Sequence, residues 1–124
     1  MAVVTNVTSF GRSGLSDFVI QRVSAVVIAL YAFVIAGFFI AHPHPDRAGL
    51  LAFFSGVAMR MFSTLAVLAT AAHAWIGMWT IGTDYVRPHY FGRHATVFRI
   101  TYQFGCLLLL FVYVLWGLAI FWSI

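Results

Sequence analysis

The sequence predicts an all-α membrane protein with three transmembrane helices, and three observations lead to this fold class. Of the 124 residues, 63% are hydrophobic and only 8% are charged. A soluble domain normally carries about 25% charged residues, and one of this size has too little interior to bury so much apolar surface. Three windows each hold the run of about 20 mostly apolar residues that crosses a bilayer. We therefore interpret residues 1–124 as one transmembrane domain.

The first predicted span covers residues 23–41, with the sequence VSAVVIALYAFVIAGFFIA. The segment before it lacks a basic start followed by an apolar core, so it does not resemble a cleavable signal peptide. A His-Pro-His-Pro run at 42–45 should stop this helix, because the residue before each proline is pushed out of the helical region. Residues from about Asp46 to Arg60 are predicted to form a short helix in the membrane interface, with Asp46 near its N-terminus.

The second and third predicted spans cover residues 61–81 and 100–122, and arginines orient the bundle. Five arginines flank the start of the first span or lie between the second and third spans, and two lie in the other connection. The five are Arg12, Arg22, Arg87, Arg93 and Arg99, and the two are Arg47 and Arg60. Because basic loops stay inside, the N-terminus is predicted to be cytoplasmic and the C-terminus periplasmic.

The ionic side chains exclude several classes of function. The only acids are Asp17, Asp46 and Asp84, too few and too dispersed to supply a carboxylate pair for hydrolysis. The arginines are not gathered into one run. The net charge of +4 therefore indicates membrane orientation and contact with anionic lipid rather than nucleic-acid binding. Cys106 is the sole cysteine, which rules out an internal disulfide or an iron–sulfur cluster held by this chain alone.

His73 lies at membrane depth in the second span, where an ionisable group is costly and usually faces the bundle interior. At about 100° per residue, small and polar residues share its helix face and bulky residues occupy the opposite one. The first set is Ala66, Ala69, Thr70, Gly77, Thr80 and Asp84, and the second is Leu68, Trp75 and Trp79. This face predicts either close helix packing with a hydrogen bond across helices, or ligation and proton transfer by the imidazole.

The groove of small residues favours a flat, bulky ligand such as haem, whose iron takes an imidazole nitrogen axially. The remaining histidines fall in connections or at span ends, namely His42, His44, His89 and His94. A second axial histidine would therefore have to come from another polypeptide. At the cytoplasmic end of the same span, Asp84, Tyr85 and Arg87 fit either an interfacial anchor or a site for a lipid-soluble molecule with a polar head.

Two long segments resemble a known family. They are GRSGLSDFVIQRVSAVVIALYAFVIAGFF near the start and HAWIGMWTIGTDYVRP in the middle. Both resemble the small hydrophobic membrane anchor subunit of bacterial succinate dehydrogenase, the D-type subunit of respiratory complex II. The resemblance extends over nearly the whole chain, including the ending VLWGLAIFW, although residues 42–58 carry little of it.

This resemblance implies a role for each candidate residue. His73 would be the axial ligand of a haem b iron, shared with the larger, C-type cytochrome b anchor subunit. Tyr85 would hydrogen-bond ubiquinone, with Asp84 beside it. Arg22 would lie near the haem propionates, as suits a fixed cation. Ser16 stands where some relatives carry a histidine, and its hydroxyl still offers one hydrogen bond to that region.

The resemblance also implies the function. The chain would be a subunit of succinate:quinone oxidoreductase in the bacterial inner membrane, where it docks the flavoprotein and iron–sulfur subunits. It would take part in electron transport from succinate to quinone, within the tricarboxylic acid cycle, without being catalytic alone. An anchor of a quinol–fumarate reductase and a purely structural, haem-free anchor remain alternatives. A small transporter is disfavoured because no acidic side chain accompanies His73 at the midplane.

Overall fold

The computed structural model describes residues 14–85 and 92–124, apart from the side chains of residues 83–85. Its elements, in chain order, are α1 (Gly14–Ala41), α2 (Arg47–Ser55), α3 (Val57–Tyr85), the short 3-10 helix η1 (Gly92–His94) and α5 (Ala95–Ser123). Within the described residues, three helices are long and apolar enough to cross a membrane. The predicted all-α class with three transmembrane helices is confirmed. Arg12 and Arg87, on which the predicted orientation partly depends, lie outside the described residues.

Each predicted span lies inside a longer helix. The three long helices contain 28, 29 and 29 residues, which at 1.5 Å per residue corresponds to about 42–44 Å. The hydrocarbon core of a bilayer is about 30 Å thick. The helix ends therefore extend beyond the apolar windows and can reach the headgroup region, where polar residues are tolerated.

The connection between α1 and α3 contains the predicted short helix, with a different end. α1 stops at Ala41, directly before the His-Pro run, as predicted. Asp46 caps α2, because its carboxylate Oδ1 accepts a hydrogen bond of 2.7 Å from the backbone N–H of Gly49. The prediction that this helix continues to Arg60 is wrong. Gly56 adopts an extended conformation, with φ of −63° and ψ of 147°, and α3 begins at the next residue.

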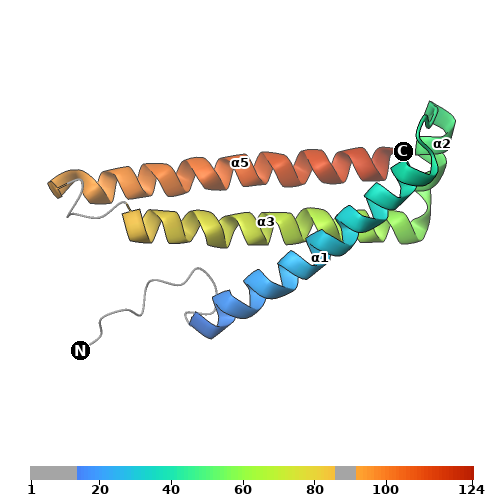
Figure 1. Ribbon diagram of the computed structural model, residues 1–124. Helices are drawn as coiled ribbons and strands as arrows, with labels where there is room; N and C mark the ends of the chain where they lie inside the picture. Colours follow the sequence, from blue (N-terminus) through green and yellow to red (C-terminus); the bar gives the residue numbers. More distant parts are fainter. Residues whose placement is uncertain (1–13, 86–91) are drawn as a thin grey trace.

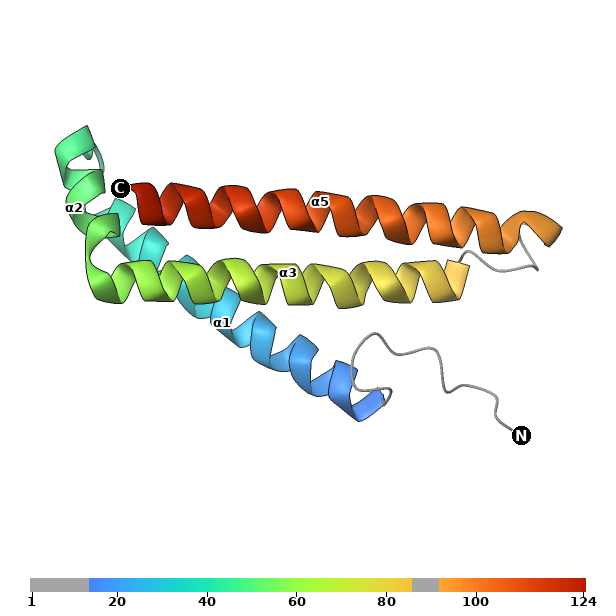
Figure 2. The ribbon, with the colours of Figure 1, turned by 180° about the vertical axis from the view of Figure 1, so that it is seen from behind.

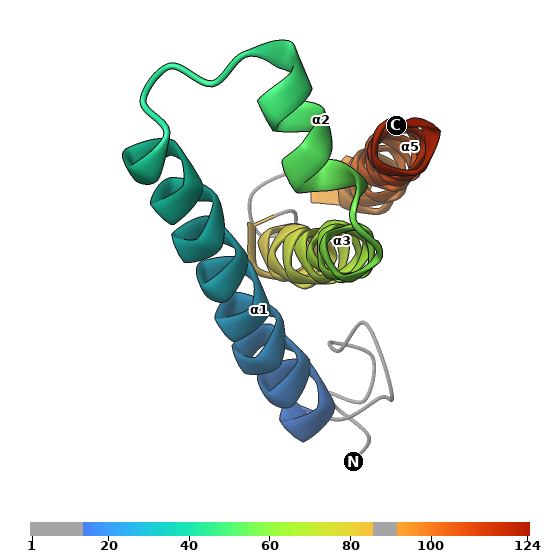
Figure 3. The ribbon, with the colours of Figure 1, turned by 90° about the vertical axis from the view of Figure 1, so that its right-hand side faces the viewer.

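α3 is the central helix of the bundle. Figures 1 and 2 show α3 and α5 running side by side over most of their length, whereas α1 crosses α3 at an angle and diverges from it towards its own N-terminus. Figure 3, viewed along α3 and α5, shows how steeply α1 is inclined to both. In the apolar window of α3, 28% of the residues are buried, against 6% in α1 and in α5. The outer faces of α1 and α5 are thus left for lipid or for another protein.

The contact between α3 and α5 is close because Gly117 lacks a side chain. A Cβ atom on Gly117 would lie 3.1 Å from Cγ2 of Val67, so only glycine permits this approach without a shift. At the same end, the indole N–H of Trp122 donates a hydrogen bond of 2.7 Å to Oγ1 of Thr64. The guanidinium of Arg60 lies 5.8 Å from the centroid of the Trp122 ring. These contacts hold the end of α5 against the start of α3.

The contact between α1 and α3 is made by a hydroxyl pair and an aromatic pair. The hydroxyls of Tyr31 and Ser63 lie 2.6 Å apart, and Ser63 is fully buried. The ring of Tyr31 packs edge-on against Phe62, with centroids 5.1 Å apart. Where the two helices separate further along, one more polar contact joins them, and it involves His73.

Candidate functional site

His73 on α3 is joined to Ser24 on α1. Nδ1 of the imidazole lies 3.1 Å from the hydroxyl oxygen of Ser24. Ser24 is buried, with 5% of its surface exposed, whereas His73 is half-buried. Within the described residues, Nδ1 is the ring nitrogen of His73 with a hydrogen-bond partner, and Nε2 has none. The ring therefore presents one paired nitrogen towards α1 and one nitrogen that can still bind a ligand.

The predicted groove of small residues is half closed and half open. Ala66 and Ala69, one to two turns before His73, are buried, which is the close helix packing that small residues permit. Gly77, one turn after His73, is different: a Cβ atom built on it would meet no described atom within 4 Å. The prediction of close packing with a hydrogen bond across helices is confirmed for Ala66, Ala69 and His73, and ligation or proton transfer by the imidazole stays a prediction. Open space therefore lies at Gly77, one turn from His73 towards the α3 C-terminus.

The bulky residues predicted on the other face of α3 lie away from this space. The rings of Trp75 and Trp79 pack against each other, with centroids 5.7 Å apart. Leu68, on the same face, is exposed. These side chains leave the surroundings of Gly77 unfilled.

Arg22 and Ser16 lie on α1 between Ser24 and the helix N-terminus. At 1.5 Å per residue, Arg22 is about 3 Å and Ser16 about 12 Å from Ser24 along the helix axis. Arg22 is exposed, and its guanidinium lies 5.0 Å from the centroid of the Phe18 ring. Ser16 is half-buried. The fold thus brings Arg22 close to the depth of His73, while Ser16 lies two turns further out.

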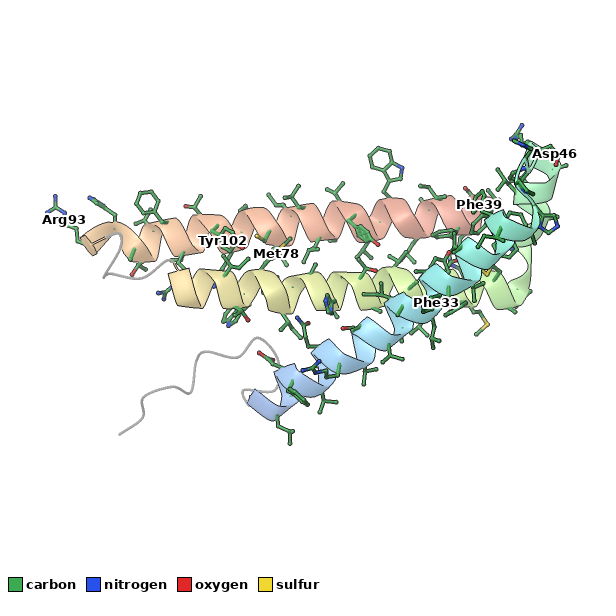
Figure 4. The ribbon with its side chains drawn as sticks, viewed as in Figure 1. Phe33, Phe39, Asp46, Met78, Arg93 and Tyr102 are labelled. Atoms are coloured by element: carbon green, nitrogen blue, oxygen red, sulfur yellow. The ribbon has the colours of Figure 1, made fainter. Side chains whose placement is uncertain are left out.

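Asp84 and Tyr85 belong to the last turn of α3, but their side chains lie outside the part of the chain that the structure describes. Their backbone follows His73 by about 17 Å along the helix axis. This end of α3 lies on the same side of the bundle as the N-terminus of α1, and Figure 4 places Arg93 at this end and Asp46 at the opposite one. Arg93 and the backbone of the Asp-Tyr pair thus share one side of the bundle.

The best-defined cavities among the described residues are not lined by His73. One, of about 1010 Å³, lies between the end of α1 and α2 and is lined by residues that include His42, His44 and Asp46. A smaller apolar cavity of about 390 Å³ follows the seam of α1 and α3, and its lining includes Ser24 and Ala69. Among the described residues, no group of three or more His, Cys, Asp or Glu side chains is arranged to hold a metal ion. Any iron bound at His73 would need a ligand from elsewhere.

Ser24 is the residue of this site that the sequence did not single out. It sits in an apolar run, where a lone serine usually bonds back to its own helix. Its hydroxyl does donate such a bond, of 3.1 Å, to the backbone carbonyl of Gln21. Its second contact, with His73, depends on where α1 crosses α3, and no spacing within α1 encodes that crossing.

Comparison with known proteins supplies the family. No protein-family model matches the chain. A curated relative does: the succinate dehydrogenase hydrophobic membrane anchor subunit of Coxiella burnetii (strain RSA 493 / Nine Mile phase I) is 32% identical over 111 residues, which cover 90% of each chain. At this identity and coverage, with three membrane-spanning helices in place, the chain belongs to the family of succinate dehydrogenase hydrophobic membrane anchor subunits.

Proposed function

We propose that this anchor subunit, together with a C-type anchor subunit, holds a haem b through His73. We further propose that it forms part of a ubiquinone site at the Asp84–Tyr85 end of α3. In this function the complex passes electrons from succinate to quinone, while the chain itself docks the flavoprotein and iron–sulfur subunits to the membrane. The family membership supports the anchoring role.

The observation that carries the haem proposal is the state of the His73 side chain. The ring is half-buried, its Nδ1 is paired with Ser24, and its Nε2 has no partner among the described residues. The open space at Gly77 gives a flat macrocycle room beside the ring. The residues present therefore fit the group.

Three residues of this chain would receive the haem. Nε2 of His73 would bind the iron, and Gly77 would let the macrocycle approach the α3 backbone. Arg22, an exposed cation near the depth of His73, would offset the charge of the propionates. The bound haem would supply a one-electron carrier close to the quinone. A further protein ligand to the iron would come from the C-type subunit.

The quinone proposal rests on residue chemistry and on depth in the membrane. A phenol donates a hydrogen bond to a carbonyl oxygen, and a neighbouring carboxylate can organise the donors around it. Asp84 and Tyr85 end α3 on the side where α1 begins. By the arginine distribution this side is cytoplasmic, the side on which the soluble subunits would dock.

The exposed apolar surface supports membrane and partner contacts. Large side chains on both outer helices are exposed, among them Phe33 on α1, at 73%, and Trp116 on α5, at 67%. Figure 4 shows Phe33 on α1, well away from α5. Such faces are stable when covered by lipid tails or by other transmembrane helices. We infer that the C-type subunit covers the part that faces the haem.

The substitution His73→Ala tests the haem proposal. In the purified complex it should remove the b-type signal from the reduced-minus-oxidised absorption spectrum and lower the haem content to near zero, because the iron loses an axial ligand. The matched control is His94→Ala, which removes a histidine at the N-terminus of α5 and should leave the spectrum unchanged. An unaltered haem content in the His73 variant would refute ligation and favour a haem-free anchor.

The substitution Tyr85→Phe tests the quinone proposal. It removes the phenol hydroxyl and should slow succinate-to-ubiquinone electron transfer by about 100- to 1000-fold, the scale of losing one hydrogen-bond donor to the reacting substrate. Succinate oxidation by a soluble artificial acceptor should persist. Tyr113→Phe, in the middle of α5, is the control and should have no effect. Normal ubiquinone kinetics in the Tyr85 variant would remove this residue from the site.

A further inference from the structure

Ser24 stands between two polar atoms at the crossing of α1 and α3. Its hydroxyl donates to the backbone carbonyl of Gln21 at 3.1 Å, and its oxygen lies 3.1 Å from Nδ1 of His73. A serine hydroxyl carries one proton and two acceptor lone pairs. When the proton is directed to the carbonyl, the oxygen accepts at its other contact. Nδ1 of His73 is then the donor and bears the proton.

We propose that Ser24 is a positioning residue that selects the tautomer of His73 and aims its ring. With the proton held on Nδ1, the neutral imidazole carries its free lone pair on Nε2. Nε2 is the nitrogen without a partner among the described residues, so the polar contact and the ligand-binding atom are on opposite sides of one ring. This inference rests on the proposed binding of haem iron by His73.

The location of Ser24 gives its hydroxyl an importance beyond a hydrogen bond to its own helix. Ser24 is buried and faces another helix, at a depth where no bulk water can replace the lost acceptor. Metal-binding histidines generally donate their second ring N–H to a fixed acceptor, which sets the ring orientation and raises its basicity as a ligand. Here α1 supplies the acceptor, so the position of α1 helps to set the orientation of the His73 ring on α3.

The test compares Ser24→Ala, which removes the acceptor, with Ser24→Thr, which keeps a hydroxyl. Both are measured in the intact complex by the rate of haem loss to an apo-haemoprotein acceptor and by the haem midpoint potential. Ser24→Ala should release haem about 10- to 100-fold faster, the usual effect of losing such a partner. Its midpoint potential should rise, because a less basic imidazole stabilises ferric iron less. Ser24→Thr should restore both values.

Two controls keep this inference separate from the proposed function. Ser63→Ala removes another buried serine from the same helix contact, one that pairs with Tyr31 rather than with His73. It should leave the haem loss rate and the potential unchanged, and an effect equal to that of Ser24→Ala would reduce Ser24 to a packing role. If His73→Ala loses haem while Ser24→Ala behaves as the parent, the positioning role alone is overturned. If His73→Ala itself retains haem, the proposed function fails, and the inference with it.

Discussion

The two halves of α3 differ in what surrounds them. The first half, around Ser63 to Ala69, is packed between α1 and α5, with Ser63, Ala66, Val67 and Ala69 all buried. The second half, from His73 onwards, is mixed: Gly82 lies close to the ring of Tyr102 on α5, whereas a Cβ atom on Gly77 would meet no described atom within 4 Å. Small residues are frequent in both halves. The first half uses them to bring helices together, and the second does so at Gly82 but leaves open space at Gly77.

The difference shows that a face of small residues has no single meaning in a membrane helix. Small side chains allow close packing only where another helix actually follows the same face. Figure 1 shows α1 diverging from α3 towards its own N-terminus, and the contact between Ser24 and His73 joins the two helices. One turn beyond His73 on α3, the Cβ position of Gly77 faces open space. The histidine therefore lies between the packed half and this open space.

Three variants test this difference between the two halves of α3, and the largest effect is expected from Gly77→Leu. A leucine there would fill the space beside His73 and exclude a flat ligand, so haem binding in the complex should weaken by about 1–3 kcal/mol, as in overpacked sites. Haem content after purification measures the loss. Gly37→Leu, in α1, also places a side chain where no described atom lies within 4 Å, and it should keep its haem. Full haem content in the Gly77 variant would show that the recess is not used.

An intermediate effect is expected from Gly117→Val, in the packed half. Its side chain would meet Val67, whose Cγ atoms lie 3.1 and 3.3 Å from the position of a Cβ. The variant should lose about 1 kcal/mol of stability, the lower end of the usual cost of overpacking, seen as a lower thermal midpoint of the complex in detergent. Gly105→Val, on the same helix but facing open space, should not change the midpoint. Unchanged stability in the Gly117 variant would contradict the close contact of α3 and α5.

The smallest effect is expected from Tyr31→Phe. This change removes the phenol that pairs with the buried hydroxyl of Ser63 at 2.6 Å. Polar contacts between membrane helices are worth about 0.6 kcal/mol on average, so the thermal midpoint should fall only slightly and haem should be retained. A double variant with Ser63→Ala should be no less stable than the single Tyr31 variant, because neither hydroxyl is then left alone. Loss of haem from Tyr31→Phe would mean that the two halves are not independent.

Much of the fold followed from the sequence because the bilayer imposes it. Apolar length alone located the three spans, and the His-Pro run at 42–45 placed the end of α1 correctly. The second boundary failed at Gly56, where a single residue in an extended conformation separates α2 from α3. A Ser-Gly pair such as the one at 55–56 can mark a turn, and the prediction did not use this signal.

The candidate site was predicted unevenly for a physical reason. His73 was identified because an imidazole in an apolar run is costly and therefore conspicuous. Ser24 was not, because a serine in such a run satisfies its proton within its own helix at little cost. The roles of Asp84 and Tyr85 remain predictions, since their side chains lie outside the described residues. The proposed contacts of Arg22 and Ser16 with a haem also remain predictions.

The sequence by itself determined the membrane location, the three helices and the one histidine at membrane depth, because desolvation energies depend on residue type and run length alone. Only the tertiary structure decided which small residues are packed, which nitrogen of His73 is paired, and which serine pairs with it. Those outcomes depend on the angle at which α1 crosses α3, and that angle results from many weak contacts between residues far apart in the chain.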